Sequence, residues 1–102
     1  MIEVLYFAGC PNREPAVTLA RDVARALRVD DAICEVEVAT DADAERLRFL
    51  GSPTVRVDGV DIDPEAATQT DYSLSCRMYG SSGVPSRDLL VRALEARGGP
   101  ER

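Results

Sequence analysis

The sequence of 102 residues predicts an α/β fold, in which a four-stranded mixed sheet carries helices on both faces. Three observations predict this class. Residues 2–7 are apolar at nearly every position, as expected for a strand that is buried on both faces. The helical pattern that follows is long enough for a right-handed parallel crossover to the next strand. The dipeptide Asp58-Gly59 later marks a tight turn between two antiparallel strands.

The first helix is expected at residues 13–28, with Asn12 as its N-cap. Residues 33–38 alternate between apolar and acidic side chains, which predicts a strand at the sheet edge with one wet face. Cys34 lies on the apolar side of this strand, and we interpret it as a small buried residue. The apolar positions of the first helix are Ala16, Val17, Ala20, Val23, Ala24 and Leu27.

A short helix is expected at residues 41–50, capped by Thr40 or Asp41 and followed by Gly51 at the C′ position. Residues 54–57 have the alternation of a strand. The order of elements is therefore strand, helix, strand, helix, strand, strand, helix.

The fourth strand has two alternative registers. It lies either at residues 60–62 or at residues 74–79, where every second side chain is apolar or a thiol. The second register separates it from the third strand by a polar, irregular loop at residues 63–73. The last helix is expected to open at Pro85 and Ser86 and to end near residue 98. The side chains that share one face in the second register are Leu74, Cys76 and Met78.

Composition restricts the function. The chain predicts one domain, residues 1–98, with residues 99–102 as a frayed tail. The net charge of −6 disfavours nucleic acid and anionic membranes as partners. His is absent, which excludes Cys-His and Ser-His-Asp catalysis. No apolar run is long enough to span a bilayer, no signal peptide is evident, and the odd number of cysteines favours free thiols, so we expect a cytoplasmic protein without metal or cofactor. The cysteines are Cys10, Cys34 and Cys76.

Cys10 stands between the first strand and the first helix. The helix dipole places about half a positive charge at that end, and unpaired backbone N–H groups point outward there. Arg13 adds a full positive charge nearby, and Asn12 belongs to the same turn. Surroundings of this kind lower the pKa of a thiol and make the sulfur nucleophilic. The plain alternative is a small apolar residue that fills a turn.

With this turn, the run Ser52-Pro53-Thr54-Val55 and the Asp58-Gly59 turn, the chain resembles the thioredoxin superfamily, most closely its glutaredoxin-like branch. The resemblance covers nearly the whole chain and implies the order βαβαββα. It implies that Cys10 is the reactive cysteine. It further implies that the Ser52–Pro53 bond is cis, that Pro53 packs against Cys10, and that the backbone beside Pro53 holds an extended thiol substrate.

The sequence departs from the family at three points. The C-x-x-C motif is replaced by Cys10-Pro11-Asn12-Arg13, so that the resolving cysteine is missing and dithiol turnover through this motif is excluded. A Trp that often precedes the motif is also missing. Asp63-Pro64 stands in place of the Gly-Gly that glutaredoxins use near glutathione, so glutathione binding does not carry over.

The first hypothesis is monothiol redox chemistry, as in a thiol–disulfide oxidoreductase. A Cys10 thiolate attacks the disulfide of a protein or a small molecule and forms a mixed disulfide. Asn12 and Arg13 stabilise the thiolate, while Ser52, Pro53 and Thr54 bind substrate, the last through its backbone N–H. Cys76 is the candidate internal resolving thiol; the plain alternative is a buried strand cysteine.

Two other hypotheses remain open. Cys10 and Cys76 together could grip a thiophilic ion, and the chain has a faint similarity to small thioredoxin-like proteins labelled alkylmercury lyase. That chemistry needs a carboxylate proton donor, for which the candidates are Glu14, Asp58 and Asp61. Alternatively, the fold has lost turnover and docks a peptide against Pro53. The tyrosines that would suit such a surface are Tyr72 and Tyr79.

Overall fold

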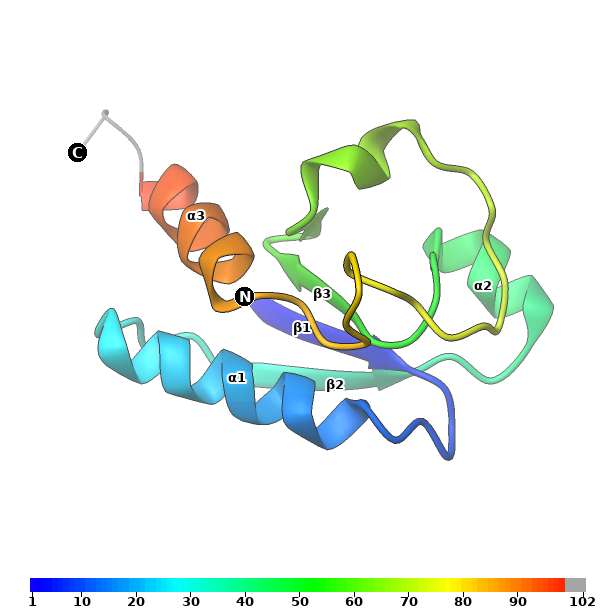
Figure 1. Ribbon diagram of the computed structural model, residues 1–102, viewed down its shortest axis with the longest axis horizontal. Coiled ribbons are helices and arrows are strands. Elements are labelled where there is room, and N and C mark those ends of the chain that lie inside the picture. Colours follow the sequence, from blue (N-terminus) through cyan, green and yellow to red (C-terminus); the bar gives the residue numbers. More distant parts are fainter. Residues whose placement is uncertain (99–102) are drawn as a thin grey trace.

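A computed structural model describes residues 1–98 and confirms the α/β class (Figure 1). The sheet has four strands in the order β2-β1-β3-β4. β1 pairs parallel with β2 and antiparallel with β3, and β3 pairs antiparallel with β4. The predicted tail, residues 99–102, lies outside the described residues. The strands are β1 (Ile2–Tyr6), β2 (Ile33–Glu37), β3 (Thr54–Val57) and β4 (Val60–Asp61).

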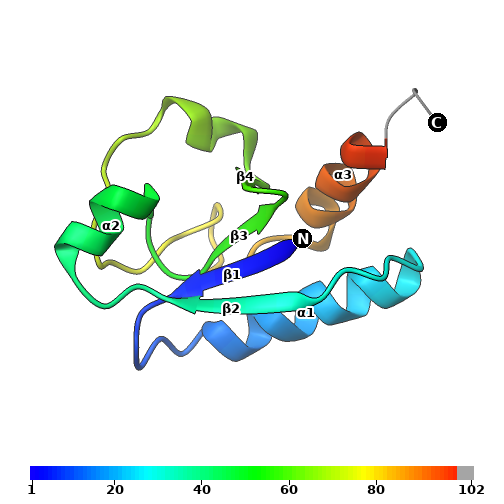
Figure 2. The ribbon, with the colours of Figure 1, turned by 180° about the vertical axis from the view of Figure 1, so that it is seen from behind.

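Helices cover both faces of this sheet, as expected. α1 and α3 lie side by side on one face, whereas α2 lies at the opposite end of the molecule (Figures 1 and 2). A short 3₁₀ helix, η1, follows β4, inside the segment that we expected to be an irregular loop. The helices are α1 (Arg13–Ala26), α2 (Asp41–Leu47), η1 (Pro64–Thr68) and α3 (Arg87–Gly98).

The larger core lies between the sheet and the pair α1 and α3. It joins apolar side chains of β1 and β3 to the inner faces of both helices. Full burial of one valine, leucine or isoleucine side chain stabilises a fold by about 1.5–3 kcal/mol. Its buried members are Ile2, Val4, Ala16, Val17, Ala20, Val23, Ala24, Val55, Val57, Ile62, Leu90 and Leu94.

A smaller core lies on the other face of the sheet. Leu5 points away from α1, because successive side chains of a strand alternate between faces. It packs with Val38, with Ala44 of α2 and with Phe49, which is fully buried. α2 therefore covers the other face only at the β1 and β2 side of the sheet.

The helix ends differ from the predicted ones. Thr40 caps α2 as expected, since its hydroxyl accepts a hydrogen bond from the Asp43 N–H at 3.0 Å. α2 stops at Leu47 rather than at residue 50, because Arg48 takes the left-handed conformation with φ of 54°. Gly51 is thus not the C′ residue of this helix. The Arg56 side chain secures the end by donating to the carbonyl oxygens of Leu47 and Arg48 at 2.6 and 2.9 Å.

The first and last helices are each shorter than predicted at one end. α1 ends at Ala26 instead of residue 28, where Arg28 has φ of 56°. α3 begins at Arg87, and the hydroxyl of Ser86 accepts a hydrogen bond from the Leu89 N–H at 3.2 Å. Of the two registers for the fourth strand, the one directly after the turn is confirmed, since β4 is Val60–Asp61.

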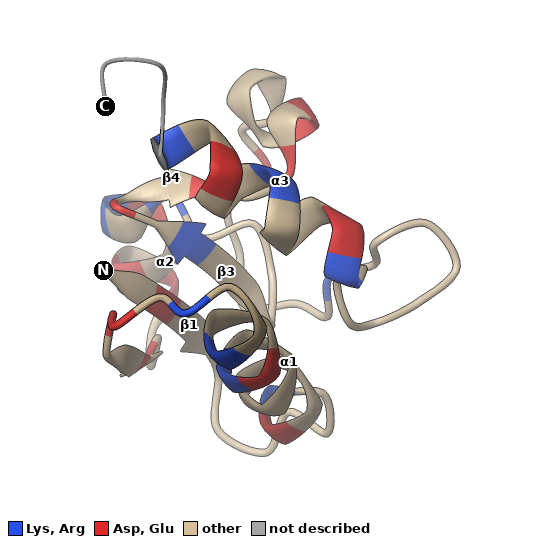
Figure 3. Ribbon diagram, turned by 90° about the vertical axis from the view of Figure 1, so that its left-hand side faces the viewer, with Lys and Arg blue, Asp and Glu red and all other residues tan. Residues whose placement is uncertain are grey.

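Basic and acidic residues are interspersed along the chain (Figure 3). One pair among them joins two distant parts of the chain. Arg97 of α3 makes a two-pronged contact with Asp31, with distances of 2.7 and 3.0 Å. Arg97, and next the amine of Met1, hold the pKa of the Asp31 carboxyl well below its usual value. This pair connects the end of α3 to the turn before β2.

We therefore predict that Asp31→Asn makes stability less sensitive to acid. Because the pKa of Asp31 is depressed in the folded state, its ion pair stabilises the fold above about pH 4, the usual pKa of Asp, and this contribution is lost as the pH falls further. Urea denaturation between pH 7 and pH 2 should give a flatter acid limb for the variant than for the wild type. Asp22→Asn, at an exposed pair with Arg25, serves as the control and should keep the wild-type profile. Identical acid limbs for wild type and Asp31→Asn would contradict the prediction.

Candidate thiol site

Cys10 lies in a tight turn between β1 and α1. Its N–H donates to the carbonyl of Phe7 at 3.2 Å, and Gly9 within the turn has φ of 87°, a conformation that glycine adopts at no steric cost. Only 9% of Cys10 is exposed. Cys10 is therefore a buried residue, three residues before the first residue of α1.

The turn and the Ser52–Pro53 bond emerge at the same end of the sheet. β1 and β3 are antiparallel neighbours, and Leu5 stands opposite Thr54 at the last position of their ladder. The chain therefore leaves β1 toward Cys10 at the end where it enters β3 from Pro53. That Pro53 packs against Cys10 stays a prediction.

The Ser52–Pro53 peptide bond is cis, as predicted. Both residues are fully buried. The carbonyl oxygen of Pro53 accepts a hydrogen bond from the Tyr79 hydroxyl at 2.6 Å. The Ser52 hydroxyl has no hydrogen-bond partner among the described residues. A buried hydroxyl without a partner costs about 1–3 kcal/mol.

Residues 75–77, which we call the Cys76 segment, run beside Ser52 (yellow in Figure 1). The Ser52 N–H donates to the Ser75 carbonyl at 2.7 Å, and the Arg77 N–H donates to the Ser52 carbonyl at 2.9 Å. Cys76 stands between these two bonds, in an isolated parallel bridge with Ser52, and it is exposed.

The structure corrects the orientation expected for this region. No strand forms over residues 74–79, and the side chains expected to share a buried face point outward instead: Leu74 is 37% exposed and Met78 is 59% exposed. Arg77 takes the interior position, with 6% exposure. The alternation is thus real, but the charged residue, not the apolar one, is on the buried side.

Arg77 is buried because every side of its guanidinium has a partner. It contacts both carboxylate oxygens of Asp61 at 2.7 and 3.0 Å, and it donates to the Thr54 hydroxyl at 3.1 Å. The ring of Tyr79 stacks on the guanidinium at 4.5 Å, and Asp63 lies 3.8 Å away. Two-pronged contacts between arginine and carboxylate are among the strongest hydrogen bonds in proteins.

These contacts also set the ionisation of the group. Burial acts to lower the pKa of Arg77, but Asp61, Tyr79 and Asp63 together raise it above its usual value, so that the side chain stays charged. Burial raises the pKa of the Tyr79 hydroxyl, which therefore remains a hydrogen-bond donor to Pro53.

The residues expected to stabilise a Cys10 thiolate are engaged elsewhere. Arg13 donates to the Glu35 carboxylate at 2.8 Å and lies 3.7 Å from the centre of the Tyr6 ring. Its charge is thus largely compensated by Glu35. Asn12 occupies the N-cap position but makes no capping hydrogen bond. Its side chain packs on Gly83 instead, where an added Cβ would stand 2.3 Å from the Asn12 amide nitrogen.

Thr54 also departs from its expected role. The Val55 carbonyl accepts from the Ile62 N–H on the β4 side. Because successive backbone groups of a strand point to opposite sides, the N–H of Thr54 points toward β1. It is therefore turned away from an added substrate. The hydroxyl of Thr54 donates to the Gly51 carbonyl at 2.7 Å.

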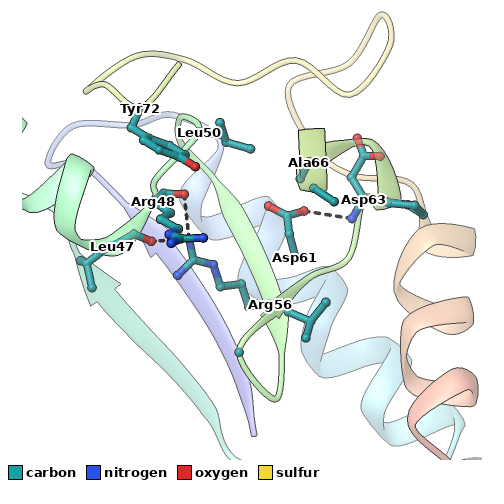
Figure 4. Close-up of a pocket in the computed structure, with 12 residues that line it drawn as sticks. Leu47, Arg48, Leu50, Arg56, Asp61, Asp63, Ala66 and Tyr72 are labelled. Atoms are coloured by element: carbon teal, nitrogen blue, oxygen red, sulfur yellow. Dashed lines mark hydrogen bonds between the residues drawn. The ribbon is translucent and has the colours of Figure 1, made fainter. Parts of the chain in front are cut away.

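A pocket of about 370 Å³ lies next to this network, between the end of α2, the β3–β4 hairpin and η1 (Figure 4). Tyr72 closes one side of it over Arg48, while Asp61 and Asp63 lie on the other side. None of the three cysteines lines this pocket. Of the carboxylates proposed as proton donors, Asp61 is paired with Arg77, and Asp58 contacts the amine of Met1.

No match to this chain was found among protein-family models, curated proteins or solved structures. The resemblance to the thioredoxin superfamily therefore stays a prediction. Within the part of the chain that the structure describes, no group of three or more His, Cys, Asp or Glu side chains could hold a metal ion. Nor is any helix there both long and apolar enough to cross a membrane.

Sequence reasoning missed Arg77, the residue that organises this region. The signal was present in the alternation of residues 74–79, since Arg77 lies opposite the face shared by Cys76 and Met78. Two acidic residues, Asp61 and Asp63, could have indicated a buried partner. The strand pattern alone favours apolar burial, because a charge enters the interior only with its counter-charge.

We predict that Asp61→Asn destabilises the fold by about 3 kcal/mol, because it leaves the buried Arg77 charge with only the more distant carboxylate of Asp63, at 3.8 Å. The free energy of unfolding in urea gives the measurement. Asp88→Asn, at an exposed pair with Arg92 on α3, is the matched control and should leave stability nearly unchanged. Equal losses of stability in the two variants would show that the buried pair of Arg77 and Asp61 stabilises the fold no more than an exposed pair does.

Proposed function

We propose that this protein performs monothiol thiol–disulfide exchange through Cys10, with Cys76 as the second thiol. The observation that carries the proposal is the placement of Cys76. Two backbone hydrogen bonds hold this exposed thiol beside Ser52, the residue before the cis-proline, at the end of the sheet where Cys10 also lies. Free thiols of this kind suit the reducing cytoplasm, which we infer as the location.

The proposed reaction has two steps. The Cys10 thiolate attacks a disulfide R–S–S–R′, which forms a Cys10–S–S–R bond and releases R′S⁻. The Cys76 thiolate then attacks the Cys10 sulfur, which forms a Cys10–Cys76 disulfide and releases RS⁻. One substrate disulfide is reduced to two thiols while the two cysteines are oxidised. Two molecules of a thiol R″SH then reduce the Cys10–Cys76 disulfide by the same exchange, which returns both cysteines to thiols and releases R″S–SR″.

Two hydrogen-bond donors at this end of the sheet lack a side-chain partner. The N-terminus of α1 presents backbone N–H groups that no Asn12 side chain caps. The Ser52 hydroxyl is a buried donor without a partner among the described residues, beside the cis bond. We propose that these donors face the reacting sulfurs during exchange, where a hydrogen bond to a charged group is worth about 1.5–3 kcal/mol.

A second candidate function is binding of a thiophilic ion by Cys10 and Cys76. The observation that favours ion binding is the position of Met78, which is 59% exposed and lies two residues after the exposed Cys76. Thiolate and thioether sulfur are soft ligands that select ions such as copper(I).

The exchange reaction predicts a specific set of products. Wild type treated with 2-hydroxyethyl disulfide should form an internal Cys10–Cys76 disulfide, whereas Cys76→Ser should stop at a mixed disulfide on Cys10. Peptide mapping by mass spectrometry identifies both. Cys34→Ser is the control, because Cys34 is half-buried in β2, and it should behave as wild type. A Cys10 that reacts no faster than Cys34 would rule out the exchange function.

Ion binding makes a different prediction. Native mass spectrometry with copper(I) should detect one ion on the wild type, and the ion should be lost in Cys10→Ser and in Cys76→Ser. Binding that persists in both variants would count against this candidate, and Cys34→Ser again serves as the control.

A further inference from the structure

We propose that the thiol site acts on small-molecule disulfides and not on extended protein disulfides, because the Cys76 segment closes the backbone edge at which a peptide would pair. This inference rests on the exchange function proposed for Cys10. It adds the substrate class, which follows from hydrogen bonds that are already made within the chain.

An extended peptide binds beside a strand by main-chain hydrogen bonds to unpaired backbone groups. Next to the cis-proline, those groups belong to Ser52, since the N–H of Thr54 points toward β1. Both groups of Ser52 are already bonded to the Cys76 segment, at 2.7 and 2.9 Å. A peptide substrate must therefore displace this segment before it can bind.

The segment is difficult to displace, because Arg77 anchors it. Its removal from the edge would pull the Arg77 guanidinium away from Asp61 and from the Thr54 hydroxyl. Breaking a buried pair in this way is strongly unfavourable. Downstream of the segment, the hydroxyl of Tyr79 holds the Pro53 carbonyl at 2.6 Å.

The other flank of the site is also narrow. Gly83 packs directly on the side chain of Asn12, two residues from Cys10. Cys10 itself is only 9% exposed. A small disulfide can reach such a sulfur end-on without backbone pairing, whereas a folded protein or an extended peptide needs more surface on both sides.

The experiment compares two disulfides with the same leaving group. One is 2-hydroxyethyl disulfide, and the other is a heptapeptide whose central cysteine is joined to 2-mercaptoethanol. Mass spectrometry in the Cys76→Ser background, which traps the product, measures only the reaction that releases 2-mercaptoethanol. In that reaction Cys10 gains the 2-hydroxyethylthio group from the first reagent and the peptide from the second, and the product of attack on the other sulfur of the peptide reagent is counted separately. The small disulfide should react at least about tenfold faster than the peptide, equivalent to about 1.4 kcal/mol of activation.

Loosening the Cys76 segment should remove this preference. Arg77→Met should raise the rate with the peptide about tenfold and leave the rate with the small disulfide nearly unchanged. Tyr79→Phe removes only the hydroxyl bond to Pro53 and keeps the ring, so it should also raise the rate with the peptide. Because this change is small, the variant should fold even if Arg77→Met does not. Arg92→Met, an exposed arginine on α3, is the matched control and should keep the wild-type ratio. Circular dichroism verifies that each variant is folded.

A peptide that reacts as fast as the small disulfide without the Arg77 or Tyr79 substitution would overturn the inference, as would a rate ratio that stays fixed in every folded variant of Arg77 and Tyr79. Failure of the exchange function gives a distinct result, in which neither reagent modifies Cys10 faster than Cys34.

Discussion

The buried contact between Arg77 and Asp61 is the interaction on which the arrangement around the cis-proline depends. It joins β4 to the Cys76 segment, across sixteen residues that include η1 and an irregular stretch. After η1, residues 69–75 belong to no helix or strand, and Leu74 among them is 37% exposed. A guanidinium with a carboxylate on one side, a hydroxyl on another and an aromatic ring on its face supplies the missing constraint.

The two faces of the sheet are therefore held in different ways. One face is covered by α1 and α3 and is stabilised by apolar packing that has no preferred direction. The other face is apolar only where α2 and Phe49 cover it. Beneath the Cys76 segment it is polar, with Thr54 and Asp61 in hydrogen bonds. Directional bonds of this kind fix one position of a loop more sharply than apolar contact does, since a partly satisfied polar network is costly.

In the exchange reaction that we propose, this division puts the second thiol on an anchored and exposed segment. Cys10 follows β1, and the backbone bonds of Ser52 carry Cys76 outward while Arg77 points inward from the next position. Cys76, the second thiol of the proposed reaction, is thus held in place by its neighbour Arg77. A C-x-x-C motif places both sulfurs on one turn, whereas here the second one is supplied by a distant segment of the chain.

Much of the fold was predictable from local patterns. The helical spacing of α1 and the alternation of β2 identify these elements, because they reflect periods of 3.6 and two residues. The apolar run of β1 identifies a strand that is buried on both faces. The helix ends were less predictable. Glycine is the usual signal for a left-handed residue after a helix, but here Arg28 and Arg48 take this conformation. The cis bond at Pro53 was expected from a resemblance and not from a local signal.

The sequence by itself determined the order of the elements, the turn that carries Cys10 and the absence of histidine chemistry. Only the tertiary structure decided that Arg77 enters the interior and that Cys76 faces outward. A charge becomes stable in the interior only with its partners, and Asp61 and Thr54, which are distant in the sequence, meet Arg77 only through folding. For the same reason the local pattern of residues 74–79 predicted the correct alternation and the wrong buried side.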